Sequence, residues 1–268
     1  MADSLAKHWH PVAAYLYILH LDGPALAWEY LRRHPDYRQD WLRHSQQPEA
    51  AQPTAQRWGL RLLEDPALDA RDAHPIWFPN SHGVHLYPDA DPMPGATLFT
   101  LWRILGDKSL IHDGVRLVLR VRWPGSCLRL AVAPGVADGM AYVYAVRAGA
   151  DLLAHAQALT LEMNNLALVN DAVPIAVVRP RPALSALQEL HTLQALDATL
   201  AGASLRDIAE GLFGSKAVAR DWHADGAMRA RMRRLVRRGD ALMRGGYRRL
   251  AQLPEPVQGR SSSPAKRP

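Results

Sequence analysis

Apolar residues recur at helical spacing through most of the first 63 residues. The earliest of them follow one another at steps of three and four residues: Trp9, Val12, Tyr15, Leu16 and Leu19. This period predicts an amphipathic helix. Asp22 and Gly23 interrupt the pattern, and Pro24 restarts a helix. That helix must end near His34, because Pro35 disfavours its continuation.

The rest of this segment predicts two shorter helical pieces separated by a loop. Residues 36–44 can form a third helix, and 58–63 another helical turn. Residues 45–56 are polar and contain proline, which is typical of a linker or surface loop. Four aromatic residues at helical spacing are expected in the core: Trp28, Tyr30, Tyr37 and Trp41. We therefore expect a helical domain over residues 1–65.

The pattern changes to short β-prone runs between residues 66 and 180. Residues 75–94 have loop composition, with five prolines. The β-prone runs are separated by Gly or Pro turns and cover 98–105, 115–121, 128–132 and 140–146. They predict a small antiparallel sheet. Apolar positions over 152–166 predict an amphipathic helix packed on that sheet, and the prolines of 170–183 mark a domain boundary.

Residues 183–253 are helical throughout in pattern. One helix over 187–200 is stopped by Gly202, and a second is capped by Ser204 and ended by Gly214. A third begins after Asp225, a suitable N-cap. We expect a helix-turn-helix-like domain here and a disordered tail over 254–268, where Pro, Ser and charged residues dominate. The expected fold class is α+β, with a helical N-terminal segment, a small central sheet and an all-α C-terminal domain.

Composition excludes several classes of protein. Apolar residues make up 48% and charged residues 22%, as in soluble globular proteins. No apolar run approaches the roughly 18–20 residues that cross a bilayer, and the N-terminus lacks the apolar core of a secretion signal, so we expect a cytoplasmic protein. A single cysteine, Cys127, excludes an internal disulfide and any Cys-rich metal site.

Positive charge is concentrated in one segment. Residues 225–250 hold nine Arg and two Asp, a local charge of +7, whereas the chain before residue 225 carries −3. At about 100° per residue, six apolar side chains of this segment gather within about 120°: Met228, Met232, Leu235, Val236, Leu242 and Met243. Six cations occupy the other side: Arg229, Arg231, Arg233, Arg234, Arg237 and Arg238. Guanidinium groups suit phosphate oxygens and guanine edges, which favours DNA binding by this face.

The order of helices resembles a helix-turn-helix, whose last helix enters the major groove. The connection from Gly214 to Asp225 is longer than the usual turn of three or four residues. Either 217–222 forms an extra helical turn or the unit is a variant. The alternatives for the basic face are a solvated surface that keeps the protein soluble, and contact with RNA or an acidic protein. Arg32 and Arg33 could dock the N-terminal domain on DNA or on the other domain, but a solvated helix end is the favoured interpretation.

No pattern indicates catalysis. His82 and His85 have metal-ligand spacing but no obvious third ligand, so we expect no metal site. Cys127 has no nucleophile motif around it. The sequence contains no Walker loop, no GxGxxG opening a βαβ unit and no GxSxG. We therefore expect no enzyme activity, no catalytic residues and no cofactor.

Two stretches resemble a known family of regulators. The C-terminal stretch consists of LDATLAGASLRDIAEGLFG at 196–214, DW at 221–222, RARMRRLVRRG at 229–239 and LMRGGYRRL at 242–250. It resembles the variant helix-turn-helix domain shared by FseA-type activators of bacterial integrative and conjugative elements and the anti-activator QseM. The run LAWEYLRRHPDYRQDW at 26–41 resembles the transcriptional-regulator-like domain that precedes it in those activators.

This resemblance implies an activator that binds double-stranded promoter DNA and controls the excision and transfer of a mobile element. Its protein partners would be RNA polymerase or an anti-activator protein, and it would not associate with a membrane. The matching basic helix supplies the six arginines above, with Arg206, Lys216 and Arg220 as flanking phosphate contacts. Because the anti-activator keeps the fold and acts through protein contact, the alternative is a protein-interaction regulator without specific DNA binding.

Overall fold

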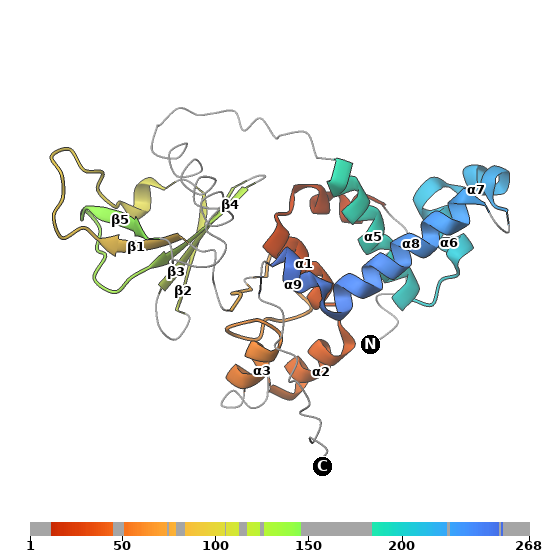
Figure 1. Cartoon of the computed structure of the whole chain (residues 1–268), viewed down its shortest axis with the longest axis horizontal. Coiled ribbons are helices and arrows are strands. Elements are labelled where there is room, and N and C mark those ends of the chain that lie inside the picture. The colour runs from red at the N-terminus through yellow and green to blue at the C-terminus, as the bar shows by residue number, and fades with distance from the viewer. Residues whose placement is uncertain are drawn as a thin grey trace, which may run out of the picture.

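Helices form both ends of the chain and a sheet forms its middle, which confirms the predicted α+β class. The structure is a computed structural model that describes residues 12–44, 51–73, 75–78, 84–104, 106–112, 117–123, 126–145, 184–223, 226–251 and 253. Figure 1 shows the sheet at one end of the molecule and the C-terminal helices at the other, with the N-terminal helices between them.

The N-terminal segment is helical, as predicted, but its pieces differ from the expected ones. It consists of the 3-10 helix η2 (Val12–His20) and the α-helices α1 (Gly23–Leu31), α2 (Pro35–His44) and α3 (Ala51–Arg57). Asp22 caps α1 by accepting a hydrogen bond from the backbone N of Ala25 at 2.8 Å. The expected loop over 45–56 was wrong in its second half, because Pro53 falls in the first turn of α3, where proline is tolerated. The expected helix at 58–63 does not form. These residues make a turn and a bend around Leu60, which forms an antiparallel β-bridge with Trp77.

The described residues of the middle region form a sheet of five strands in the order β2-β3-β4-β1-β5. The strands are β1 (Val84–Pro88), β2 (Asp107–His112), β3 (Leu117–Trp123), β4 (Ser126–Val132) and β5 (Tyr142–Ala145). Three neighbouring pairs are antiparallel, whereas β1 runs parallel to β4. The sheet is therefore mixed. The prediction of an antiparallel sheet was wrong for the pairing of β1 with β4.

Two predictions for the middle region were wrong in detail. β1 lies within residues 75–94, which were expected to be a loop. Both of its neighbours, β4 and β5, are distant in sequence, so its five residues carry no strong local signal. Residues 98–105 were expected to form a strand. Their described part, 98–104, provides only a β-bridge at Leu98 and the 3-10 turn η4 (Leu101–Arg103). The expected helix over 152–166 and the boundary at 170–183 lie outside the described residues.

The two ends of the chain share one hydrophobic core. The C-terminal helices are α5 (Leu184–Leu200), α6 (Leu205–Phe213), α7 (Ser215–Asp221), α8 (Ala227–Ala241), the π-helix η5 (Leu242–Gly246) and α9 (Tyr247–Leu250). Trp28 and Tyr30 of α1 are fully buried in the same cluster as Leu193 of α5 and Met243 of η5. A second cluster lies on the sheet, and a third joins α5, α6, α7 and α8.

Glycines allow two pairs of helices to approach closely. A Cβ added to Gly239 of α8 would lie 3.0 Å from the Cβ of Leu196 and 3.2 Å from the carbonyl oxygen of Thr192, both on α5. At the start of α1, a Cβ on Gly23 would lie 2.6 Å from the carbonyl oxygen of Leu250 on α9. The absence of a side chain at these positions sets how tightly α8 and α9 pack on their neighbours.

We predict that Gly239→Val destabilises the protein by about 1–3 kcal/mol, because the added methyl groups must displace α5. Ala241→Val, at an exposed position two residues further along α8, is the control and should cost about 0.5 kcal/mol through helix propensity alone. Urea unfolding of both variants measures the difference. Equal midpoints would show that α5 and α8 do not pack as described.

Candidate nucleic-acid interface

The sequence signals that delimit α6 are confirmed. The Ser204 hydroxyl accepts a hydrogen bond from the backbone N of Asp207 at 3.2 Å, and the Asp207 carboxylate accepts one from the backbone N of Ser204 at 2.9 Å. Together these contacts form a capping box. Gly214, with φ +84°, ends α6.

The long connection after Gly214 contains an additional helix. α7 begins at Ser215 and brings Val218 into the core with Ile208 of α6. Of the two alternatives that the sequence left open, the extra helical turn is therefore the correct one. Asp225 lies outside the described residues, and the N-cap position of α8 is occupied by Gly226.

The apolar face of α8 docks on the neighbouring helices, as predicted. Met232 and Leu235 are buried in one cluster with residues of α5, α6 and α7. Leu242 and Met243, which follow α8 in η5, instead join the core that α5 shares with the N-terminal helices. The docking surface therefore extends beyond the C-terminal helices, and α8 leads from one core into the other.

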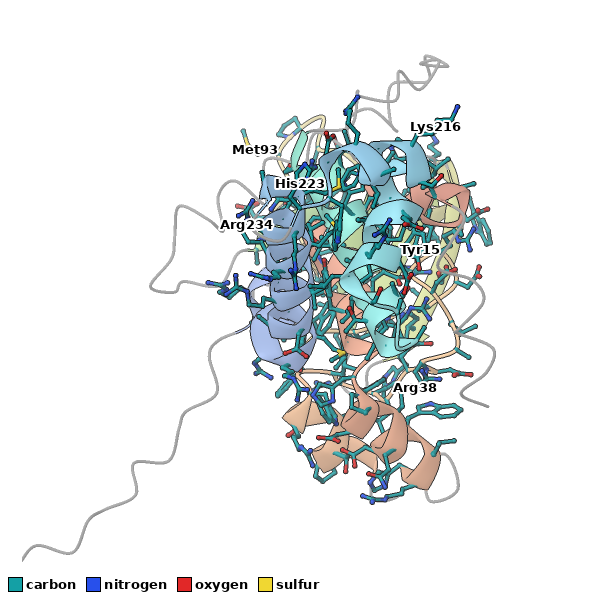
Figure 2. The ribbon with its side chains drawn as sticks, turned by 90° about the vertical axis from the view of Figure 1, so that its right-hand side faces the viewer. Tyr15, Arg38, Met93, Lys216, His223 and Arg234 are labelled. Atoms are coloured by element: carbon teal, nitrogen blue, oxygen red, sulfur yellow. The ribbon has the colours of Figure 1, made fainter. Side chains whose placement is uncertain are left out.

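The arginines lie on the opposite side of α8. Five of the six predicted side chains are exposed and Arg229 is half-buried. In Figure 2, Arg234 projects from α8 away from the body of the protein. The face that the sequence assigned to solvent is therefore the one presented outward.

Contacts within the protein divide these arginines into two groups. Arg238 forms an ion pair with Glu189 of α5, and the guanidinium of Arg231 lies over the ring of Phe213, 4.8 Å from its centroid. In contrast, Arg233, Arg234 and Arg237 have no acidic partner among the described residues. We call these three residues the arginine ridge. Their charges are available to an external anion.

The three flanking cations are all exposed, but they differ in their surroundings. Arg206 pairs with Glu210 at 3.0 Å, and Arg220 pairs with Asp221 at 2.9 Å. Both charges are therefore already offset locally. Lys216, on α7, projects into solvent near the top of the molecule in Figure 2.

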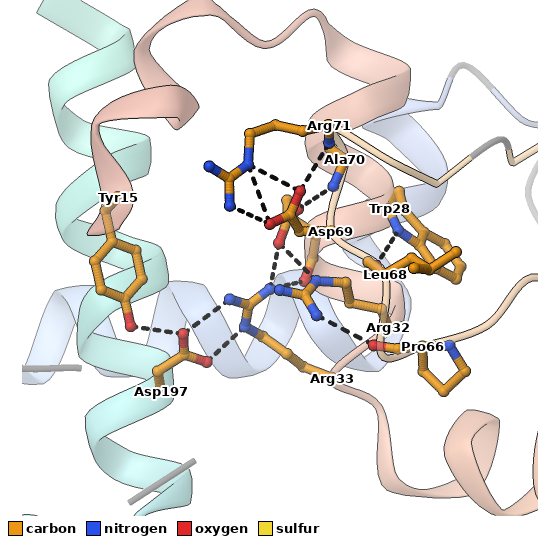
Figure 3. Close-up of polar contacts among 11 residues, drawn as sticks. Tyr15, Trp28, Arg32, Arg33, Pro66, Leu68, Asp69, Ala70, Arg71 and Asp197 are labelled. Atoms are coloured by element: carbon orange, nitrogen blue, oxygen red, sulfur yellow. Dashed lines mark hydrogen bonds and ion pairs between the residues drawn. The ribbon is translucent and has the colours of Figure 1, made fainter. Parts of the chain in front are cut away.

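A buried ion network fixes α5, the helix on which α8 rests. Arg33 of α1 forms a two-pronged pair with Asp197 of α5, with Nε–Oδ1 at 2.5 Å and Nη2–Oδ2 at 2.8 Å. The other Nη of Arg33 lies 2.6 Å from the Glu29 carboxylate. Tyr15 of η2 donates to Asp197 at 2.7 Å, and the backbone N of Ala70 donates to Glu29 at 2.6 Å. Figure 3 shows these groups converging from η2, α1, α5 and the loop after residue 65.

The favoured sequence interpretation of Arg32 and Arg33 as a solvated helix end was wrong. Arg33 is buried and holds the N-terminal helices on α5, which is one of the alternatives considered. Arg32 is largely buried and contacts Glu29 at 2.8 Å and the carbonyl oxygen of Pro66 at 3.1 Å. Local sequence could not reveal the pair with Asp197, because the partners are 164 residues apart.

Electrostatics keep this network ionised despite its burial. Burial alone would raise the pKa of the Glu29 carboxyl, but Arg32 and Arg33 outweigh it and lower that pKa below its usual value. The pKa of Asp197 is lowered in the same way, against burial, by Arg33 and by the hydroxyl of Tyr15. Burial and the neighbouring Asp197 raise the pKa of Tyr15, so its hydroxyl remains a donor.

A second polar link joins the N-terminal helices to α8. The hydroxyl of Tyr30 donates to Glu189 at 2.8 Å, and Glu189 also pairs with Arg238. Glu189 therefore connects α1, α5 and α8. Because of these two links, the orientation of the arginine ridge is set by the N-terminal helices as well as by the C-terminal ones.

Other kinds of site were sought in the part of the chain that the structure describes. Its His, Cys, Asp and Glu side chains form no group of three or more that could hold a metal ion. His85 is buried in β1, and His82 lies outside the described residues. None of the described helices is long and apolar enough to cross a membrane.

Comparison with protein families identifies regulatory domains at both ends of the chain. Residues 8–62 match the proteobacterial transcriptional regulator-like domain. Residues 146–252 match the RovC-type domain described as "T6SS, Transcription factor, DNA binding domain". Residues 81–128, which include β1 to β3, match a domain of unknown function. No curated protein matches the chain.

These matches define the class of the protein: it is a transcription factor with a DNA-binding domain. Both named domains are those of transcription regulators, which implies a protein other than an enzyme. The N-terminal match is to the kind of regulator-like domain expected there, and the C-terminal match is to a DNA-binding domain. The predicted domain bounds, 1–65 and 183–253, stay predictions. The narrower likeness to FseA-type activators of conjugative elements stays a prediction.

We predict that stability falls in acid through the buried network. The folded pKa values of Glu29 and Asp197 lie below those of the unfolded chain, which are about 4. Their contribution is therefore complete above about pH 5 and is lost as the pH falls through the folded values. Urea unfolding should give a constant free energy from pH 7 to 5 and a decrease below pH 4.

Asp197→Asn should remove part of this acid dependence and cost about 3 kcal/mol at pH 7, because Arg33 loses a buried partner. Asp240→Asn, which alters a half-exposed carboxyl on α8, should leave the acid dependence close to that of the wild type. The same pH profile in Asp197→Asn as in the wild type would contradict the proposed role of the network.

Proposed function

We propose that this protein is a site-specific DNA-binding transcriptional activator that contacts promoter DNA through the arginine ridge. The observation that carries this proposal is the set of three exposed arginines on α8 that have no acidic partner among the residues the structure describes. They lie within the segment that matches a DNA-binding domain. A basic face that served only solubility would need no such fixed orientation, whereas this helix is held by two hydrophobic cores and by Glu189.

The chemistry of the ridge suits double-stranded DNA. α8 has 15 residues and is about 22 Å long, and the major groove admits a helix of its diameter. Guanidinium groups bind phosphate oxygens or guanine edges through paired hydrogen bonds. Lys216 is the best placed of the flanking cations to add a phosphate contact, because Arg206 and Arg220 already have acidic neighbours. Arg229, Arg231 and Arg238 would support the ridge from its sides.

The target genes are the narrower part of the proposal. The likeness to FseA-type activators favours genes for excision and transfer of a mobile conjugative element. The matched DNA-binding domain is described for a T6SS transcription factor, which favours secretion genes as the second candidate. Action on either set would take place in the cytoplasm, with RNA polymerase or an anti-activator as protein partners.

We predict that Arg233→Ala/Arg237→Ala weakens DNA binding and makes it less sensitive to salt. Each lost phosphate contact lowers the slope of log K against log salt by roughly 0.9, so the double variant should lose about 1.8. Binding of a 30-base-pair duplex between 50 and 200 mM salt measures the slope. The control is Arg103→Ala, which removes an exposed arginine from η4 beside the sheet. An unchanged slope in a folded double variant would exclude the ridge from the interface.

Recovery and sequencing of genomic DNA bound at about 150 mM salt identifies the targets, because salt suppresses binding that depends on phosphates alone. We expect a small set of promoters, enriched with the wild type and lost with Arg233→Ala/Arg237→Ala. Their genes distinguish conjugative transfer from secretion. Absence of enrichment together with a tight protein complex would favour the protein-interaction regulator instead.

A further inference from the structure

The exposed cationic stripe continues past the end of α8. Steps of four and three residues place Arg233, Arg237 and Asp240 on one side of α8. Arg244 of η5 extends this side through its contact with Asp240. Arg244 donates from Nε to Asp240 at 2.8 Å, and its side chain is 65% exposed. At 1.5 Å per residue, the stripe from Arg233 to Arg244 is about 16 Å long.

The N-terminal helices bring further arginine to the end of this stripe. Arg248 of α9 donates from Nη1 to the carbonyl oxygen of Arg57, the last residue of α3, at 3.4 Å. The ring of His34 lies 4.8 Å from that of Trp58, on which the guanidinium of Arg57 packs. Burial lowers the pKa of His34 and Asp36 opposes this, whereas Arg244 and Arg57 lower the pKa further. We call Arg57, Arg244 and Arg248 the junction patch. In Figure 2, the lower end of α8 meets the N-terminal helices below Arg234.

The acids around the junction patch offset its charge only in part. Asp40 lies 3.5 Å from Arg57 and 3.6 Å from Arg43, so one buried carboxylate is shared by two cations. Asp36, which is exposed, is a second acid near His34. A third acid, Asp240, pairs with Arg244. Arg57 is 62% exposed, and its guanidinium lies over the ring of Trp58, 4.9 Å from the centroid. An aromatic face therefore positions this cation while leaving it open to solvent.

We propose that the N-terminal regulator-like domain contacts the same DNA as the arginine ridge, by binding the phosphate backbone at the junction patch. This inference rests on the proposed function. A stripe about 16 Å long spans roughly five phosphates of one strand, and the junction patch extends that contact beyond the groove that α8 meets. The DNA interface is then composite, with one part in each of the two matched domains.

The test is the salt dependence of binding to a 30-base-pair duplex of fixed mixed sequence, since phosphate contacts do not depend on sequence. Arg57→Gln/Arg244→Gln should lower the slope of log K against log salt by about 1.8. The control is Arg103→Gln, which removes one exposed charge beside the sheet. Because the sheet lies at the other end of the molecule from α7 (Figure 1), this variant should have the same slope as the wild type. Thermal unfolding verifies that each variant is folded.

Asp240→Asn provides a test of opposite sign. This substitution removes the acid that pairs with Arg244 and keeps every arginine. The variant should therefore bind DNA more tightly than the wild type does. A damaged fold would not produce such a gain. A wild-type slope in Arg57→Gln/Arg244→Gln, or no gain in Asp240→Asn, would overturn the inference. If those variants bind like the wild type while Arg233→Ala/Arg237→Ala loses DNA, only the junction patch is excluded; if the wild type itself fails to bind, the proposed function fails.

Discussion

The buried pair between Arg33 and Asp197 is the interaction on which the arrangement of the helices depends. It joins α1 to α5 through two hydrogen bonds, and Glu29 and Tyr15 satisfy the remaining polar atoms around it. Removing one partner from such a pair leaves a buried charge uncompensated, which typically costs about 3–5 kcal/mol. The pair therefore allows one placement of α5 against the N-terminal helices and penalises others.

The position of α5 in turn determines the position of α8, the proposed DNA-binding helix. Gly239 lets α8 approach α5 closely, and Glu189 holds Arg238 beside Tyr30. The proposed sequence domains, 1–65 and 183–253, are thus separate along the chain but share one core in space. Through these contacts, a shift of the N-terminal helices would also shift the position of the arginine ridge.

Local signals predicted the parts of the fold that local chemistry determines. Ser204 and Gly214 delimited α6 because a cap and a left-handed glycine act on adjacent residues, and the arginines of α8 were placed outward by helical period alone. Signals of this kind could not show β1 or the partner of Arg33, because both depend on residues far away in sequence. They also could not separate Arg238, which pairs with Glu189, from the three residues of the arginine ridge. Only the folded structure shows which three of the six predicted arginines form the arginine ridge.

Site-specific photocross-linking can show whether the outward face of α8 lies against DNA, as we propose. A benzophenone amino acid would replace Ala241, an exposed residue between Arg237 and Arg244, and in a second sample Arg103 beside the sheet. We expect cross-links to a bound promoter duplex from position 241 and none from position 103. Retained binding with no cross-link from 241, or equal cross-linking from both positions, would contradict the proposal.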